Sequence, residues 1–460
     1  MQYRRSSRRL ALTVGIGMYL ALVLAGCGAA DDQGAQAPPA QRPSAVQAAT
    51  DAASKAADGK RLGGTIDLLG VLSGPQRDAY LKTLQPFEAA TGTRIKYEST
   101  RDVSAVLQTR LAGGNPPAIV SNPSAGQMHT LAEQGKLIAL DGVVDVARVR
   151  REFPAGLVDL ASADGHLYGI FYNSAVQGLV WYDPRSYTGP KPAKTWDELA
   201  TWSERTAASG KTPWCIGLES GPASGWPGAV WIEQFVLQQA GAAAYDRWWQ
   251  GRLPWTSPEI RQAFESFGRI ATDPKLVSGG SIAVLTTSFD KSPQALFAKP
   301  PRCYLHVQAD FLGNALAQTV PGVEPVTDID FFPFPAATAG KAPAIETSGE
   351  MLGALRDTPQ TRAFMRYVAT PEFSTLVAGT GQWIGANRRT TLDAYTTPLS
   401  RRAAEVYAAA ETIRYTAQNS MPLAMSQAFL KAVLAYVKDP SSLDKQLATL
   451  EQLRQASYRS

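Results

Sequence analysis

From residue 63 onward, apolar residues alternate between the spacing of strands and the spacing of helices. Residues 65–69 form a short apolar run of strand length, and residues 75–92 carry apolar side chains at helical spacing. Residues 94–98 alternate like a strand, residues 103–111 repeat the helical spacing, and residues 118–120 form another apolar run. Strands that alternate with helices in this way pair in parallel, with the helices packed on the sheet faces. The pattern predicts an α/β fold.

The loops after the predicted strands are the expected place for a ligand. In open α/β sheets, ligands bind outside the carboxyl ends of the strands, at a switch in strand order. Residues 99–102 and 121–127 occupy such positions. The chain after residue 63 is also longer than one hydrophobic core usually holds, since cores stop growing at about 250–300 residues. We therefore expect two lobes.

The first 27 residues have the layout of an export signal. Arginines within residues 4–9 precede an apolar stretch at residues 10–24, and residues 24–27 read Leu-Ala-Gly-Cys. The apolar stretch is too short and too interrupted by glycine for a permanent membrane span. Residues 24–27 resemble the cleavage motif of bacterial lipoproteins, which implies that residues 1–26 are a signal peptide and that diacylglycerol is attached to Cys27. The alternative is an uncleaved signal anchor with an incidental cysteine.

Residues 27–62 are predicted to be a lipid-anchored, flexible tether. Residues 28–62 are dominated by Ala, Gln, Asp, Pro and Gly, and contain no aromatic residue. Such a stretch buries too little apolar surface to offset the entropy lost on ordering. The tether would hold the following body clear of the lipid surface.

The charge of the chain argues against a nucleic-acid partner. The chain has 45 basic and 40 acidic residues, a net charge of +5. Four of the basic residues lie within residues 1–26, which hold no acidic residue, so the remainder carries 41 basic against 40 acidic residues. Nucleic-acid binders carry a concentrated basic field that this balance does not supply.

The cysteines indicate a disulfide. If Cys27 carries lipid, Cys215 and Cys303 are the two that remain. An even number of cysteines in an oxidising compartment favours a bridge, so we predict a Cys215–Cys303 disulfide, with two separately buried thiols as the alternative. The three histidines are scattered, and neither C-x-x-C nor H-E-x-x-H spacing occurs. We therefore expect no metal and no other cofactor.

Several short segments resemble, in order along residues 63–460, the extracellular solute-binding proteins of bacterial ABC importers (family 1, maltose-binding-protein-like). The segments that carry the resemblance are residues 111–120, 132–141, 195–199, 213–218, 225–233, 301–304 and 349–353. The last four look most like the α-glucoside-binding branch. In that branch Thr-Asp commonly stands where this chain has Ala229 and Val230. The missing carboxylate would remove a hydroxyl acceptor, so the identity of the sugar stays open.

The resemblance implies a two-lobe fold of the type II periplasmic-binding-protein class, in which strands cross between two α/β lobes and act as a hinge. We expect lobe 1 at residues 63–175 and 310–350, and lobe 2 at residues 176–309 and 351–460. The strand crossings are expected near residues 172–180, 304–310 and 348–354. Cys215 and Cys303 then share lobe 2, where a bridge would leave the hinge free to move.

A carbohydrate needs flat aromatic faces against its C–H surfaces and polar side chains that pair with its hydroxyl groups. Trp226 is a stacking candidate because a glycine and a proline flank it, which predicts a loop. Trp231 is a second candidate, with packing in the core as its alternative. Trp383 is a third, since the glycine-rich residues 379–385 would let it project into a cleft.

The candidates for the polar part of the site are Arg101, Asp102, Asn173, Gln308, Asp310 and Glu350. Arg101 and Asp102 follow a strand and open a helix, where Asp102 has the alternative role of helix N-cap. The other four lie in or near the predicted crossings.

These observations predict an extracytoplasmic lipoprotein that captures a carbohydrate by closing its lobes. The ligand would be an α-glucoside or another di- or oligosaccharide, delivered to the permease subunits of an ABC importer. The protein would be a monomer, held to the outer face of the cell membrane by its N-terminal lipid alone. No catalytic motif such as G-x-S-x-G or a P-loop occurs, so no enzymatic activity is expected.

Two alternatives stay open. One is a binding protein for a glycerophosphodiester or another polar solute, whose phosphate would call for clustered cations or helix N-termini. The other is an exported glycosidase that uses Asp102 and Glu350 as a pair of catalytic carboxyl groups.

Overall fold

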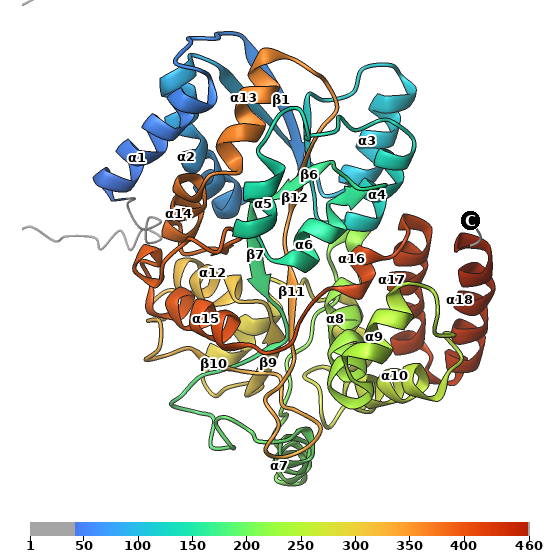
Figure 1. The fold of residues 1–460 in the computed structure, drawn as a ribbon. Coiled ribbons are helices and arrows are strands. Elements are labelled where there is room, and N and C mark those ends of the chain that lie inside the picture. The colour runs from blue at the N-terminus through green and yellow to red at the C-terminus, as the bar shows by residue number, and fades with distance from the viewer. Residues whose placement is uncertain (1–41, 459–460) are drawn as a thin grey trace, which may run out of the picture. The chain divides into compact units, whose positions relative to one another are not determined.

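The computed structural model describes residues 42–458. Its first lobe is built on a five-stranded sheet with the order β2-β1-β3-β12-β6 (Figure 1). The strands are β1 (Thr65–Gly70), β2 (Arg94–Ser99), β3 (Ile119–Asn122), β6 (Gly169–Phe171) and β12 (Met351–Ala354). β1 pairs in parallel with β2 and β3, whereas β12 runs antiparallel to β3 and β6. The predicted α/β fold is confirmed, including the parallel pairing of its first three strands.

Helices cover this sheet and carry the apolar spacing seen in the sequence. They are α1 (Pro43–Ala56), α2 (Gly74–Thr91), α3 (Val103–Ala112), α4 (Ala125–Glu133), α5 (Val146–Glu152), α6 (Ala155–Leu160), α13 (Pro359–Val368) and α14 (Pro371–Gly379). α2 has a proline in its first turn and ends at Gly92, whose φ of 67° is the left-handed conformation that glycine adopts readily. Its residues Tyr80, Leu84 and Phe87 are buried.

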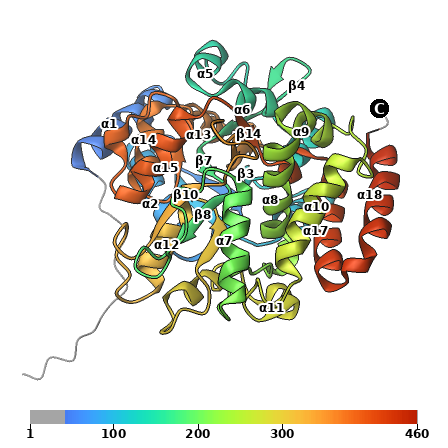
Figure 2. The same cartoon turned by 90° about the horizontal axis from the view of Figure 1, so that it is seen from below.

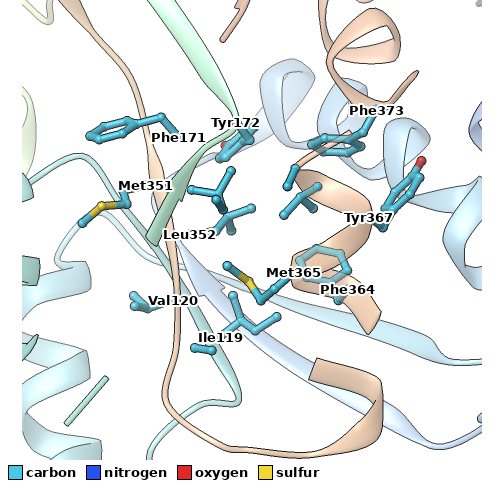
Figure 3. Close-up of a cluster of buried hydrophobic side chains, with 14 of the residues drawn as sticks. Ile119, Val120, Phe171, Tyr172, Met351, Leu352, Phe364, Met365, Tyr367 and Phe373 are labelled. Atoms are coloured by element: carbon cyan, nitrogen blue, oxygen red, sulfur yellow. The ribbon is translucent and has the colours of Figure 1, made fainter. Parts of the chain in front are cut away.

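The core of the first lobe lies between the sheet and these helices. Figure 3 shows Ile119 of β3 and Leu352 of β12 close to Met365 and Phe364 of α13. All four side chains are fully buried. Each buried residue of this size contributes about 1.5–3 kcal/mol of hydrophobic free energy, so this contact holds the late segment with α13 on the N-terminal sheet.

The second lobe carries two sheets, with the orders β10-β8-β9 and β13-β7-β11-β14. Their strands are β7 (Asn173–Val176), β8 (Leu179–Tyr182), β9 (Leu305–Gln308), β10 (Asp330–Pro333), β11 (Ile345–Ser348), β13 (Ile384–Gly385) and β14 (Ile413–Tyr415). β4 (Ser162–Ala163) and β5 (His166–Leu167) form a separate hairpin.

The helices of the second lobe are α7 (Trp196–Ala208), α8 (Trp226–Phe235), α9 (Ala242–Trp249), α10 (Pro258–Ala271), α11 (Gly280–Thr286), α12 (Phe311–Thr319), α15 (Pro398–Ala409), α16 (Ala417–Ser420), α17 (Leu423–Lys438) and α18 (Leu443–Ser457). In Figure 2, α8, α10, α17 and α18 lie side by side. An aromatic cluster that includes Trp214, Trp231 and Phe235 fills the core beneath them.

The later segments do not divide between the lobes at the predicted boundaries. β12 inserts between β3 and β6, with Gly353 opposite Val120 and Leu352 opposite Ile170, so residues from 351 through α14 belong to the first lobe. α12 and β10 pack with β8 in the second lobe, which contradicts the placement of residues 310–350 in lobe 1. β9 pairs with β8 and does not cross.

Helix α1 corrects the predicted tether over residues 43–56. Alanine is the strongest helix former, and Ala49, Ala53 and Ala56 are buried where α1 packs against α2, α13 and α14. Small side chains at one face let helices approach closely, so burial does not need large apolar residues here. The lack of aromatic residues was therefore a misleading sign of flexibility for residues 43–56.

The predicted signal peptide, residues 1–26, and Cys27 lie outside the described residues. Within residues 42–458, no helix combines the length and the apolar character needed to cross a membrane.

The predicted cysteine pair is brought together in the second lobe. Cys215 and Cys303 are joined as a disulfide with their Cα atoms 5.6 Å apart, and both are buried beside Leu296. The Cα separation lies in the range that a bridge needs.

Candidate functional site

A cavity of about 260 Å³ lies where the two lobes meet. This volume is close to the lower end of the usual range for small-molecule sites, about 300–1,000 Å³. The first lobe contributes Val71, Leu72, Gln76, Arg101 and Pro123. The second contributes residues that include Ser220, Ala223, Trp226, Phe289, Phe311, Thr416, Gln418, Asn419, Ser426 and Leu430. The junction between the lobes adds Asn173, Ala175, Gln177, Ser348, Gly349 and Glu350, and Trp383 completes the lining.

Five of the nine predicted site residues line this cavity. They are Arg101, Asn173, Trp226, Glu350 and Trp383. They come from five separate segments of the chain, so the fold assembles the site from parts of both lobes and of the junction.

Glu350 is held in a fixed orientation at the junction between β11 and β12. Its Oε2 accepts hydrogen bonds from Ser121 Oγ at 2.6 Å and Tyr172 Oη at 2.8 Å. Its backbone N–H donates to Asn173 Oδ1 at 2.7 Å. Burial raises the pKa of the Glu350 carboxyl, while the two hydroxyl donors oppose that rise. The side chain is thus an oriented acceptor at the cavity wall.

Gly349 allows the close approach of the two crossing segments. A Cβ atom at this position would lie 2.4 Å from the backbone oxygen of Asn173, so any other residue would push the strands apart. Tyr415 Oη lies 2.6 Å from the Gly349 oxygen and 2.9 Å from the Pro123 oxygen. This contact joins β14 to the loop after β3 at the cavity.

Trp226 is the first residue of helix α8 at the cavity wall, so the predicted loop around it is wrong, because Pro227 fits the first turn of a helix. Gly225 precedes it with a φ of 101°, and a Cβ atom there would lie 2.5 Å from the Leu430 oxygen, so glycine is required. The half-buried indole packs edge-on against Phe289, with ring centroids 5.3 Å apart. One end of α8 therefore presents an aromatic surface to the cavity.

Trp231 is not a cavity residue. It is 1% exposed and packs against Trp196, Trp214 and Phe235 inside the second lobe. It lies five residues after Trp226 in α8, about 1.4 helical turns, so it points to a different face of the helix and into the core. The alternative that the sequence left open, a packing role, is the correct one.

Asp102 is also outside the lining. Its Oδ1 accepts a hydrogen bond from the Ala105 backbone N–H at 3.1 Å, so it caps α3. The neighbouring Arg101 lines the cavity instead. Its guanidinium carbon lies 5.8 Å from the ring centroid of Phe289.

Gln308 and Asp310 are buried and do not line the cavity. Gln308 Oε1 accepts from the Ala309 backbone N–H at 3.0 Å. Asp310 precedes α12, and burial raises the pKa of its carboxyl to about 8. The residue that reaches the cavity from this segment is Phe311.

Sequence reasoning missed several polar and aromatic lining residues. They include Gln76, Gln177, Phe289, Phe311, Gln418 and Asn419. Gln76 sits in the first turn of α2, after the first strand, which is a position that strand-end reasoning could have found. Gln418 lies in α16 and Phe289 follows α11. Long-range packing places these helices in the fold, and no local sequence pattern marks either residue.

The departure at Ala229 and Val230 lies outside the cavity wall. Both residues are buried within α8, and neither lines the cavity. Across residues 42–458, no three histidine, cysteine or acidic side chains gather in an arrangement that would hold a metal ion.

Comparisons with known proteins place the chain among relatives of described function. Residues 73–373 match the sequence model of a family described as bacterial extracellular solute-binding protein. The chain is 33% identical over 359 residues to the osmoprotective compounds-binding protein GgtB of Synechocystis, covering 78% of this chain and 84% of the relative. It is 31% identical over 398 residues to the alpha-glucosides-binding periplasmic protein AglE of Rhizobium meliloti, covering 83% and 85%.

Solved structures of low sequence identity share the fold. The bacterial solute receptor AcbH, reported with an exclusive preference for β-D-galactopyranose, matches with a TM-score of 0.73 at 15% identity, covering 86% of this chain and all of that one. Maltose-bound MalE3 of T. maritima matches with a TM-score of 0.66 at 14% identity, covering 85% and 99%. The two-lobe fold of this class is thereby established for the chain.

Proposed function

This chain belongs to the family of bacterial extracellular solute-binding proteins, and from that premise we propose that it captures an α-glucoside or another small carbohydrate for an ABC importer. The observation that carries the proposal is the composition of the cavity wall. Trp226 and Trp383 offer aromatic faces, while Glu350, Asn173 and a set of amide side chains offer hydrogen-bond partners. Aromatic faces combined with oriented polar groups are what a sugar ring requires.

The names of two relatives support the choice of ligand class. AglE binds α-glucosides and GgtB binds osmoprotective compounds by their descriptions, and both align with most of this chain. The small cavity volume favours a ligand of few sugar units. Solute would be captured from outside the cytoplasm, and contacts from both lobes would favour the closed form.

The cavity favours binding over catalysis. Hydrolysis by a pair of carboxyl groups requires two of them facing the same bond, about 5–9.5 Å apart. Asp102 caps α3, and Glu350 is the one acidic residue among the described residues that line the cavity. Arg101 is likewise the one cationic residue of that lining, which makes a phosphodiester ligand the weaker alternative, because phosphate sites use several donors of positive charge.

The first test is a ligand panel on the full chain. Maltose, trehalose, sucrose, longer glucosides and glycerophosphocholine are titrated while tryptophan fluorescence and the melting temperature are followed. We expect saturable binding of at least one glucoside, with a raised melting temperature and no turnover of the sugar. Hydrolysis of a panel member would favour the glycosidase alternative. Absence of binding to every panel member would overturn the α-glucoside assignment.

We also propose that Cys27 carries the lipid that holds the protein, as a monomer, to the outer face of the cell membrane. The Leu-Ala-Gly-Cys sequence of residues 24–27 supports this anchor. In membrane fractionation, the Cys27→Ser variant should move from the membrane fraction to the soluble fraction. A variant that stays membrane-bound would contradict the lipid anchor.

A further inference from the structure

Two carboxyl groups that sugar binding does not use meet in the interior of the second lobe. Glu233 and Glu346 are both 0% exposed, and adjacent donors link them. The Gln418 backbone N–H donates to Glu233 Oε1, and the neighbouring Ala417 N–H donates to Tyr245 Oη, which itself donates to Glu346 Oε1.

Glu233 belongs to α8, which begins at the cavity residue Trp226, and Glu346 belongs to β11, which ends at the cavity residue Ser348. Two ionised carboxylates so close in the interior would repel each other, and this repulsion is relieved when one of them carries a proton.

The surrounding donors show which carboxyl carries the proton. Glu346 Oε1 accepts from Tyr245 Oη at 2.6 Å, and its Oε2 accepts from Gln234 Nε2 at 3.0 Å. Glu233 Oε1 accepts from the Gln418 backbone N–H at 2.6 Å, whereas its Oε2 meets no donor among the described residues. Glu346 therefore has the environment of a carboxylate, and the proton belongs on Glu233 Oε2, the carboxyl oxygen that has no donor to stabilise a negative charge.

Among residues 42–458, no cation forms an ion pair with Glu233 or Glu346. Arg414 lies opposite Glu346 in the register of β11 and β14, but its Nε donates to Asp246 Oδ1 on α9 at 2.7 Å. β7, α16 and the π-helical turn after α8 contribute no charged side chain. The other charged residues of α9, α10 and α17 are exposed or half-buried: Arg247, Glu259, Arg261, Glu265, Arg269, Lys431 and Lys438.

The titration of the pair follows from this environment. Burial, together with the repulsion of Glu346, raises the pKa of Glu233 well above its ordinary value. Burial also raises the pKa of Glu346, to about 7. Burial and the two acids likewise raise the pKa of Tyr245, so its hydroxyl stays a donor. Tyr415, on β14, also stays protonated, since burial raises its pKa.

We propose that Glu233 and Glu346 form a proton-sharing carboxyl pair that clamps the crossing strand β11 to helix α8 and makes solute binding weaken as the pH rises. With the proton in place, the pair joins three elements that carry cavity residues: α8 with Trp226, β11 with Ser348, and α16 with Gln418. Loss of the last proton places two negative charges in contact in a medium of low dielectric. The repulsion then separates β11 from α8, and the cavity residues that these two elements carry are no longer held in position.

Infrared spectroscopy and unfolding test the clamp without any solute. At pH 8, the full chain should show the carbonyl stretch of a buried, protonated carboxylic acid that disappears in Glu233→Gln. The free energy of unfolding of the wild type should fall between pH 5 and 9, and Glu233→Gln, whose amide carries no charge, should flatten that fall. Glu265→Gln, which changes an exposed acid on α10, is the matched control and should behave like the wild type.

Glu346→Gln supplies the same test of the pH slope if Glu233→Gln does not fold. An unchanged carboxylic-acid band in Glu233→Gln, or pH slopes of both variants equal to that of the wild type, overturns the clamp.

The effect on solute affinity rests on the proposed function and is measured with maltose. The wild type should bind maltose at least about tenfold more weakly at pH 9 than at pH 6, the factor that one unit of pKa carries, while Glu233→Gln should lose less. Equal pH dependence in the two proteins overturns the link to binding. Absence of maltose binding at every pH counts against the proposed ligand, whereas the infrared and unfolding results still decide the clamp.

Discussion

The guanidinium carbon of Arg101 lies 5.8 Å from the ring centroid of Phe289, which connects the two sides of the cavity. Arg101 follows β2 in the first lobe, and Phe289 follows α11 in the second. Phe289 in turn packs edge-on against Trp226. The three side chains form a continuous contact from one lobe to the other, next to the aromatic surface proposed for the sugar.

We predict that Phe289→Leu weakens solute binding with little change in stability. The substitution keeps an apolar side chain but removes the aromatic face, and a cation–π contact at an exposed site is worth about 0.5–1 kcal/mol. That loss corresponds to an affinity about two- to fivefold weaker, measured by titration with the glucoside that binds in the panel. Phe297→Leu, at a half-buried phenylalanine near the disulfide, is the control. Wild-type affinity in Phe289→Leu would contradict the bridging role.

Trp226 and Trp231 should respond in opposite ways to replacement by alanine. Trp226 is half-buried at the cavity, so Trp226→Ala should reduce affinity strongly and change the melting temperature little. Trp231 is 1% exposed in the aromatic core, so Trp231→Ala should cost about 3–5 kcal/mol of stability. Solute titration and urea unfolding of both variants measure the two effects. Equal affinity of wild type and Trp226→Ala would exclude stacking on Trp226.

Glu350→Gln should weaken binding through the loss of an oriented, charged acceptor. A hydrogen bond to a charged group is worth about 1.5–3 kcal/mol, so the affinity should fall by roughly 10- to 150-fold. Ser121→Ala removes one donor that orients the carboxyl and should give a smaller loss. Isothermal titration of the three proteins with the same glucoside measures both effects. A loss in Ser121→Ala that exceeds the loss in Glu350→Gln would argue against direct contact of Glu350 with the solute.

The sequence predicted features whose signal is local. The first three strands of the sheet follow from short patterns of residues, and the same patterns left the cap formed by Asp102 open as the alternative to a role in the site. The lobe boundaries could not be predicted in this way, because the pairing of β12 with β3 joins residues near 352 to residues near 121. Helix periodicity is the same whichever lobe a helix joins.

The residues of the site also divide into those with a local sequence signal and those without one. Arg101 and Glu350 were found because their neighbours predict a strand end and a crossing. Trp226 was found as an aromatic residue between a glycine and a proline, although these residues begin a helix and not a loop. Phe289 and Gln418 reach the cavity through long-range packing of α11 and α16. Trp226 and Trp231 lie in the same short aromatic stretch of sequence. They differ in the face of α8 on which they lie, which directs Trp231 into the core and Trp226 to the cavity.

Removal of the Cys215–Cys303 bridge should destabilise the second lobe. The two cysteines are 88 residues apart in sequence, and closing a loop of this order removes enough entropy from the unfolded chain to stabilise a protein by about 2–4 kcal/mol. Unfolding of a Cys215→Ala/Cys303→Ala variant in urea measures the loss. Reductant should shift the wild type toward the variant and leave the variant unchanged. Two free thiols in denatured, unreduced wild type would contradict the bridge.

Asp310→Asn should stabilise the protein more at high pH than at low pH. Burial raises the pKa of the Asp310 carboxyl to about 8, well above its value in an unfolded chain, about 3.9. The folded state therefore holds a proton that the unfolded state releases, so this contribution to stability is fully present below about pH 4 and is lost as the pH rises toward 8. The amide carries no charge, so the variant should gain about 1–3 kcal/mol over the wild type at pH 9 and little at pH 4. Urea unfolding across this range measures the difference, with Asp78→Asn at an exposed position as control. A gain that is the same at pH 4 and pH 9 would show that Asp310 does not titrate in this range.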